Sequence, residues 1–342
     1  MSDPHDVARH IFINDENELR SGWRVLVFVT CLIIVGALLT GMALALGTLV
    51  PSLDYLRREG LIPLAASNVS NLAAALIASA ICVNVLERRR LGSVGFKLHR
   101  RWLRDFGLGS MMGAASLAIA VGIAASTGAY SFDVQTPGFA SLARGFAITS
   151  LVFVVAGATE ELIFRGFPFQ ALVHNLGESK AIVISSLVFG LAHLTNPGAS
   201  VLSTTNTVLA GTWLGLAYLM TRSLWLATAL HWSWNFAMVF IFGLPVSGIT
   251  TLGDLSWLKG RIGEPIWISG GDYGPEAGLA ATVALILSTL AIWKSGLFTT
   301  SNEMLLAITH GKPEPALLSI TPDTEVLPAT DQDNQTRESR LP

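Results

Sequence analysis

The stretch TEELIFR, residues 159–165, places three ionisable residues (Glu160, Glu161 and Arg165) directly behind a long apolar run, Phe146 to Ala158. A charged residue at the centre of a membrane helix costs roughly 2.5 to 3.5 kcal/mol on insertion scales. Charges that a chain keeps at such a cost usually serve a function. We therefore take this stretch as the candidate functional site.

The spacing of the three charges assigns them different roles if the stretch is helical. Glu161 and Arg165 are four residues apart with the acid nearer the N-terminus, which is the favourable order for an ion pair along one helix face. Glu160 then points about 100° away around the helix, from ~3.6 residues per turn. We expect Arg165 to neutralise Glu161 and Glu160 to be available for chemistry. The alternative is a structural ion cluster that only joins helices.

Composition defines the class of protein. Hydrophobic residues make up 51% of the chain and charged residues 13%, and the mean hydropathy is +0.54. Such a chain is typical of a membrane protein that crosses the bilayer several times. The net charge of -2 argues against a nucleic-acid partner, and two cysteines argue against a disulfide framework or a cysteine metal site.

The apolar runs predict an all-α polytopic membrane bundle of about eight transmembrane helices, with a polar active-site cavity within the membrane. We expect the spans at 23–50, 61–86, 106–129, 146–174, 181–195, 201–221, 224–244 and 277–293. We expect a polar N-terminal tail at 1–21, a transmembrane domain at 22–298 whose core, at about 144–242, carries the polar motifs, and a disordered tail at 299–342. The mixed segment 245–275 is expected to form a partly folded interfacial cap.

The loop from Glu87 to Arg104 carries the densest group of basic residues in the chain. By the positive-inside rule this loop is cytoplasmic, and eight spans then place both termini in the cytoplasm. Lipid headgroups are the expected partner of such a loop. We expect an integral, multi-pass protein of a bacterial inner membrane.

Two further polar groups lie in the later spans. His193 ends an apolar run four residues after Phe189, and His231 and Asn235 are four residues apart and share a helix face. A single intramembrane histidine is more often a hydrogen-bonded core residue than a ligand. Several such groups together can supply one another with polar partners, so we expect them to meet Glu160. This argument assumes that the motif helix continues, kinked, through 166–168.

Three patterns, Glu-Glu-x-x-x-Arg, Phe-x-x-x-His and His-x-x-x-Asn, follow one another in this order on successive spans. Together they resemble the CAAX-protease and bacteriocin-processing family of intramembrane endopeptidases, also called the Abi family, over roughly Arg144 to Phe242. The resemblance implies an endopeptidase that acts on a membrane-associated, prenylated or leader-peptide substrate. The catalytic residues it implies are Glu160, Glu161, Arg165, His193, His231 and Asn235.

Peptide hydrolysis needs an activated water, stabilisation of the oxyanion and a proton for the leaving amine. Glu160 can act as the base for a water held against His193, while His231 and Asn235 donate hydrogen bonds to the oxyanion. An alternative mechanism uses a zinc ion held by Glu160, His193 and His231. We favour the metal-free mechanism, with no cofactor, because the chain lacks His-Glu-x-x-His and asparagine is an uncommon zinc ligand.

Two other functions are possible for the same polar cluster. A non-catalytic immunity or regulatory protein would keep the helices and tolerate loss of Glu160. A proton-coupled transporter would use the acid and the histidines as a relay, but the inverted repeats typical of many transporters are not found. We expect a peptide or membrane-protein substrate and membrane lipids as partners.

Overall fold

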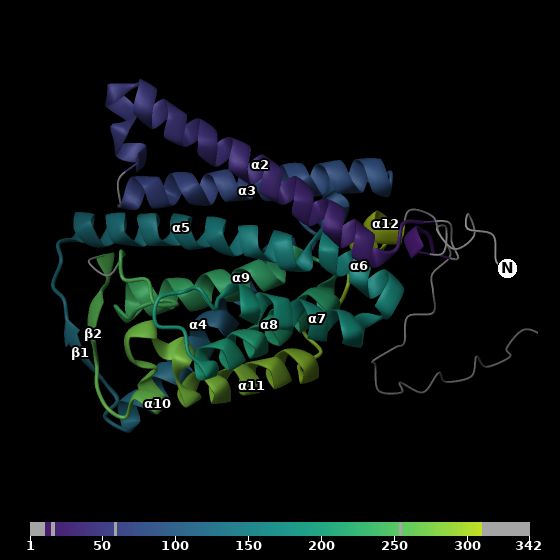
Figure 1. The fold of residues 1–342 in the computed structure, drawn as a ribbon. Helices are drawn as coiled ribbons and strands as arrows, with labels where there is room; N and C mark the ends of the chain where they lie inside the picture. The colour runs from purple at the N-terminus through teal and green to yellow at the C-terminus, as the bar shows by residue number, and fades with distance from the viewer. Residues whose placement is uncertain (1–10, 15–17, 58–59, 253–254, 310–342) are drawn as a thin grey trace, which may run out of the picture. The chain divides into compact units, whose positions relative to one another are not determined.

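The computed structural model describes residues 11–14, 18–57, 60–252 and 255–309. Helices account for most of them (Figure 1). The helices that occupy the eight predicted spans are α2 (Ser21–Leu49), α3 (Leu61–Leu86), α4 (Trp102–Ser126), α5 (Phe139–Arg165), α7 (Glu178–Ala192), α8 (Val201–Thr221), α9 (Leu224–Phe236) and α11 (Leu279–Lys294). The remaining named elements include α6 (Phe167–Leu176), α10 (Ile266–Ser269), α12 (Asn302–Thr309), β1 (Tyr130–Val134) and β2 (Leu258–Ile262).

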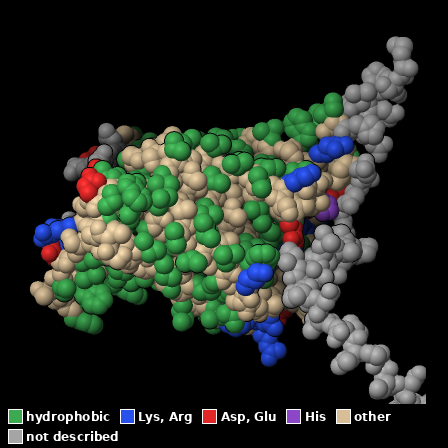
Figure 2. Space-filling model, turned by 90° about the horizontal axis from the view of Figure 1, so that it is seen from below, with side chains coloured by type: hydrophobic (Ala, Val, Ile, Leu, Met, Phe, Trp, Pro, Cys, Tyr) green, Lys and Arg blue, Asp and Glu red, His purple; other side chains and the backbone are tan. Residues whose placement is uncertain are grey.

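Five helical segments among the described residues are long and apolar enough to cross a membrane: α2, α3, α4, α5 with α6, and α9 with the π-helical turn that extends it to Ile241. In contrast, α7 and α11 have 15 and 16 residues, fewer than the ~20 of a full crossing, and α8, although 21 residues long, is not among the five. Hydrophobic side chains cover the middle of the face in Figure 2, and charged ones lie towards its two ends. The chain is an integral membrane protein with the predicted all-α polytopic bundle.

Small residues set the closest helix contacts. The glycine-rich helix α4 packs against α9, where a Cβ built on Gly113 would lie 2.2 Å from Ser233 Oγ and 2.4 Å from the Leu230 carbonyl oxygen. Gly211 of α8 likewise meets Ser186 of α7, because a Cβ there would lie 2.8 Å from the Ser186 Cα. Without side chains these backbones approach closely, as is common for membrane helices.

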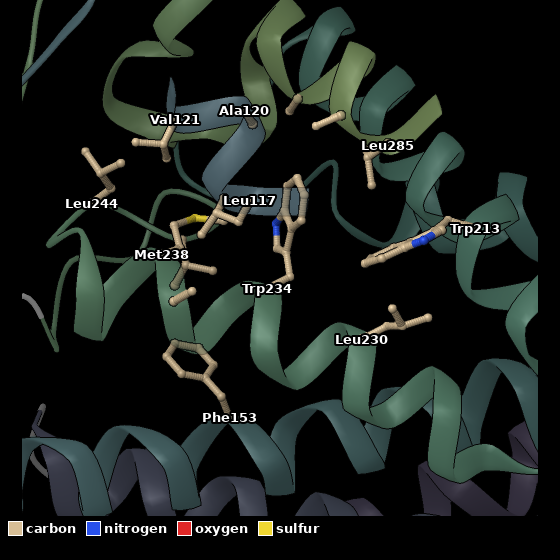
Figure 3. Close-up of a cluster of buried hydrophobic side chains, with 14 of the residues drawn as sticks. Leu117, Ala120, Val121, Phe153, Trp213, Leu230, Trp234, Met238, Leu244 and Leu285 are labelled. Atoms are coloured by element: carbon tan, nitrogen blue, oxygen red, sulfur yellow. The ribbon is translucent and has the colours of Figure 1, made fainter. Parts of the chain in front are cut away.

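The largest hydrophobic core lies between α4, α8, α9 and α11 (Figure 3). The indole rings of Trp213 and Trp234 are 5.9 Å apart in an edge-to-face arrangement that suits their charge distribution. Leu117 of α4 and Leu285 of α11 pack around them and are buried. The α2 and α3 pair packs together, and α3 contacts α5 (Figure 1).

A two-stranded antiparallel sheet lies at the end of the bundle away from α6 and α12 (Figure 1). Tyr130 pairs with Ile262 and Val134 with Leu258. The second strand and α10 lie in the segment 245–275 that the sequence predicts to be a partly folded cap, and a short 3-10 turn at Pro275–Ala277 follows at its end. We call residues 245–278 the cap.

The basic loop is tied to the C-terminal segment at the opposite end. The Arg100 amide donates to Glu303 Oε2 at 2.6 Å, and Arg104 Nη2 donates to the Leu297 carbonyl at 2.9 Å. The tail predicted from residue 299 therefore begins with the helix α12, and residues 310–342 lie outside the described residues. Arg89 and Lys97 also donate from their side chains to backbone carbonyls of this segment, at 3.2 Å to Ile308 and 3.1 Å to Glu303.

We predict that Gly113→Ala destabilises the bundle and that Gly122→Ala, on the same helix, does not. A Cβ on Gly122 meets nothing within 4 Å, whereas one on Gly113 overlaps α9. Overpacking costs about 1 to 3 kcal/mol, and the gain in helix propensity is common to both variants. Thermal unfolding in detergent checks this prediction, and equal midpoints for the two variants would contradict it.

Candidate active site

The motif helix ends at its last charged residue. Glu160, Glu161 and Arg165 occupy the last two turns of α5, and Gly166 separates α5 from α6. A Cβ on Gly166 would lie 2.2 Å from the Leu162 carbonyl oxygen, so only glycine fits this sharp change of direction. The expectation that one helix runs through 166–168 with a kink is corrected to two helices, with Pro168 in the first turn of the second.

Glu161 and Arg165 form the ion pair that their spacing predicts. Arg165 Nη1 donates to Glu161 Oε1 at 3.1 Å, and both side chains are almost completely buried. The second guanidinium nitrogen donates to the Gly211 carbonyl of α8 at 3.1 Å. The Phe189 ring of α7 lies against the guanidinium, 4.4 Å from its carbon, which adds a cation–π contact.

His231 of α9 joins the same carboxylate. Its Nδ1 lies 2.9 Å from Glu161 Oε1, and because a carboxylate only accepts, Nδ1 carries the proton and donates. This bond fixes the ring so that Nε2 faces Glu160 Oε2 at 3.8 Å.

His193, which ends α7, reaches Glu160 from another side. Its Nδ1 donates to the Phe189 carbonyl at 2.8 Å, so its Nε2 is also directed at Glu160 Oε2, again at 3.8 Å. Two imidazoles from two helices therefore present the same nitrogen to one carboxylate oxygen. That oxygen is buried and has no hydrogen-bond partner among the described residues.

A cavity of about 610 Å³ contains this cluster. Glu160, His193 and His231 line it together with Asn235, which lies one turn beyond His231 on α9. Asn235 Oδ1 is buried without a partner among the described residues, so the amide is not held by a bond through that oxygen. The structure thus brings together the residues that the sequence predicts to meet.

Other parts of the cavity are apolar. Val152, Phe153, Leu214 and Leu285 are among its lining residues. Asn68 of α3 also lines it, although its sequence context alone favours a simple contact between helices. A cavity that is largely apolar with a few converging polar groups is the usual form of a site for an organic ligand.

The cap adds a second carboxylate that the sequence analysis does not identify. Glu276 lines the cavity, and its Oε2 accepts bonds from both the amide and the hydroxyl of Ser247, each at 2.7 Å. Burial raises the pKa of the Glu276 carboxyl above its ordinary value. The only sequence sign of this residue is an acid between Pro275 and the last apolar span.

The distances between the candidate zinc ligands are longer than those in an ideal tetrahedral zinc site. Nitrogen and oxygen ligands at about 2.0 to 2.2 Å from a tetrahedral zinc lie about 3.4 Å from each other. Glu160 Oε2 is 3.8 Å from each histidine nitrogen. No group of three His, Cys, Asp or Glu side chains in the described part of the chain is arranged to hold a metal ion.

The structure defines a polytopic membrane protein with an acid-histidine cluster in a largely apolar cavity. Residues 143–237, just over a quarter of the chain, match the family described as type II CAAX prenyl endopeptidase Rce1-like. This match confirms the resemblance to the CAAX-protease and bacteriocin-processing family, and it covers Glu160, Glu161, Arg165, His193, His231 and Asn235. The comparison with curated proteins gives no match.

We predict that Glu161→Leu strongly lowers stability, because it leaves Arg165 buried without its partner and removes the acceptor for His231. Breaking a buried ion pair costs about 3 to 5 kcal/mol. Asp133→Asn, which breaks the exposed pair of Asp133 with Arg261 between the strands, is the control and costs at most about 1 kcal/mol. Membrane accumulation and thermal unfolding measure both; equal losses would contradict the structural role of Glu161.

Proposed function

We propose that the chain is an intramembrane endopeptidase in which Glu160 activates a water molecule. The observation that carries this proposal is the convergence of two histidine nitrogens on one carboxylate oxygen, each at 3.8 Å. That separation is too long for a direct hydrogen bond and suits a small bridging molecule. The family of residues 143–237 supports the same reaction class.

In the first step, Glu160 takes a proton from a water that also hydrogen-bonds to His193 Nε2. The water oxygen attacks the peptide carbonyl carbon, and the carbonyl electrons move onto its oxygen. In the second step the tetrahedral intermediate collapses, the carbon–nitrogen bond breaks, and Glu160 returns the proton to the leaving amine. Each step balances without an oxidant, a reductant or a metal.

The oxyanion needs hydrogen-bond donors. In this proposal the His231 ring, held through Nδ1 by Glu161, also carries a proton on Nε2 and donates it to the oxyanion. Asn235 lines the same cavity one turn further along α9 and supplies a neutral amide donor. Such donors are worth most in a water-poor site.

Glu161 and Arg165 act through other groups. Glu161 holds the His231 ring, and Arg165 anchors Glu161 to the carbonyl of Gly211. The two residues are therefore positioning residues in this proposal. In this proposal no cofactor is needed.

The substrate in this proposal is a peptide or membrane protein that enters from the lipid phase, in line with the apolar side chains of the cavity. A prenylated protein or a leader peptide is compatible with this lining. We place the basic loop and both termini in the cytoplasm of a bacterium and the cap on the outer side of the inner membrane.

We predict that Glu160→Gln abolishes cleavage with normal accumulation. Loss of a general base lowers the rate by about 10²- to 10⁴-fold. Termini of membrane proteins and released peptides are compared by mass spectrometry in cells with wild type, Glu160→Gln or the control Glu178→Gln, whose carboxylate pairs with Arg222 away from the cavity. The purified protein is expected to hold far less than one equivalent of zinc.

Termini that are present with wild type and Glu178→Gln but absent with Glu160→Gln identify the substrates. If none vanishes while the cellular phenotype of the gene persists in that variant, the cluster is a binding or regulatory site and the endopeptidase proposal fails.

We predict that Asn235→Ala lowers kcat by about 10²- to 10³-fold, because one oxyanion donor is lost. The side chain is not fixed by a bond through Oδ1, so the thermal midpoint should stay close to that of wild type. Cleavage of a substrate from the comparison of termini, followed in proteoliposomes, provides the rate. An unchanged kcat would remove Asn235 from the oxyanion role.

A further inference from the structure

The ionisable side chains that line the cavity in the described part of the chain are carboxylates and histidines. Two carboxylates, Glu160 and Glu276, line it, and among the described residues no lysine or arginine does so. The two histidines are engaged with Glu160 and Glu161. In the proposed reaction Glu160 is the base, so Glu276 is left without an assigned role.

Glu276 is held by hydrogen bonds from Ser247 and Asn206. Ser247 donates two hydrogen bonds to Oε2 of its carboxylate. Asn206 of α8 donates through Nδ2 to the backbone carbonyl oxygens of Glu276 and Gly278, at 2.8 and 3.0 Å. Thr282 of α11 in turn donates to Asn206 Oδ1 at 2.6 Å. The carboxylate therefore has a fixed place relative to α8 and α11.

The loop that carries Ser247 is also tightly fixed. Ser247 has a φ of 49°, an uncommon conformation for a residue with a side chain, and its neighbour Gly248 donates to the Tyr273 carbonyl at 2.9 Å. A Cβ on Gly248 would lie 2.0 Å from the Pro197 carbonyl oxygen, in the loop directly after His193. The cap is thus packed onto the segment that carries a site histidine.

One carboxylate oxygen remains for a ligand. Both bonds from Ser247 reach Oε2, and Oε1 has no hydrogen-bond partner in the part of the chain that the structure describes. Glu276 lines the same cavity as Glu160, His193 and His231. A group bound at Oε1 therefore lies in the cavity where the proposed reaction takes place.

We propose that Glu276 binds a lysine or arginine side chain of the substrate, so that the enzyme selects peptides with a basic residue near the scissile bond. This inference rests on the proposed endopeptidase function and adds its substrate class. A partly desolvated carboxylate discriminates strongly, because a neutral residue leaves it without a partner and an acidic one adds repulsion. A free peptide carboxylate would find no lysine or arginine in this lining.

The test uses peptides of one apolar host sequence that carry a single arginine, citrulline or glutamate, moved one position at a time. Citrulline has nearly the shape of arginine but no charge. Binding is measured on the full chain in lipid nanodiscs in the Glu160→Gln background, where the proposed cleavage is blocked. Glu276→Gln is compared with Asp272→Asn, which removes an exposed charge of the same cap outside the cavity.

At one or more positions, arginine peptides should bind about tenfold or more tightly than their citrulline counterparts, as is typical of hydrogen bonds to charged groups. Glutamate peptides should bind weakest. Glu276→Gln keeps an oxygen for Ser247 and should bring the arginine-to-citrulline ratio close to one, whereas Asp272→Asn should leave it unchanged.

Equal binding of arginine and citrulline peptides to the chain that retains Glu276, at every position, overturns the inference. A preference for arginine that persists in Glu276→Gln overturns it as well. Mass spectrometry of the same peptides with the chain that retains Glu160 separates the two proposals. Binding preference without Glu160-dependent cleavage removes the endopeptidase function alone, and cleavage without charge preference removes the role of Glu276 alone.

Discussion

The buried ion pair between Glu161 and Arg165 is the constraint on which the rest of the site depends. Burying either charge alone would be very costly, and their attraction offsets that cost only when the remaining polar atoms also find partners. Those partners come from elsewhere in the bundle: the Gly211 carbonyl of α8, the Phe189 ring of α7 and His231 of α9. One ion pair on α5 thereby fixes three neighbouring helices around the same point.

The same constraint gives two adjacent carboxylates different surroundings. Glu161 is buried and holds Nδ1 of His231, while Glu160, about 100° further around α5, faces Nε2 of the same ring. His231 is therefore oriented by one acid and directed at the other. The glycine at 166 ends α5 just after the pair, so α6 changes direction without disturbing the hydrogen bonds of the motif turn.

The cavity joins this cluster to the cap, and the cap is where prediction from sequence is weakest. Glu276 and Ser247 lie far from the motif in the chain, and neither belongs to a pattern of spacing that indicates chemistry. The cap that carries Glu276 and Ser247 lies against the segment of His193 because Gly248 packs closely against the Pro197 carbonyl. No local sequence pattern encodes this contact. The pairing of β1 with β2 is likewise a contact between segments that are far apart in the chain.

The sequence by itself determined the membrane class, the all-α bundle and the i,i+4 ion pair, because hydropathy and helical spacing act over short stretches of chain. It also indicated that Glu160, His193, His231 and Asn235 gather, since buried polar groups need one another. Only the tertiary structure decided that both histidines face one oxygen of Glu160, that the motif helix stops at Gly166 and that Glu276 shares the cavity. Those features depend on the angles and distances between helices, which are set by the packing of many residues at once.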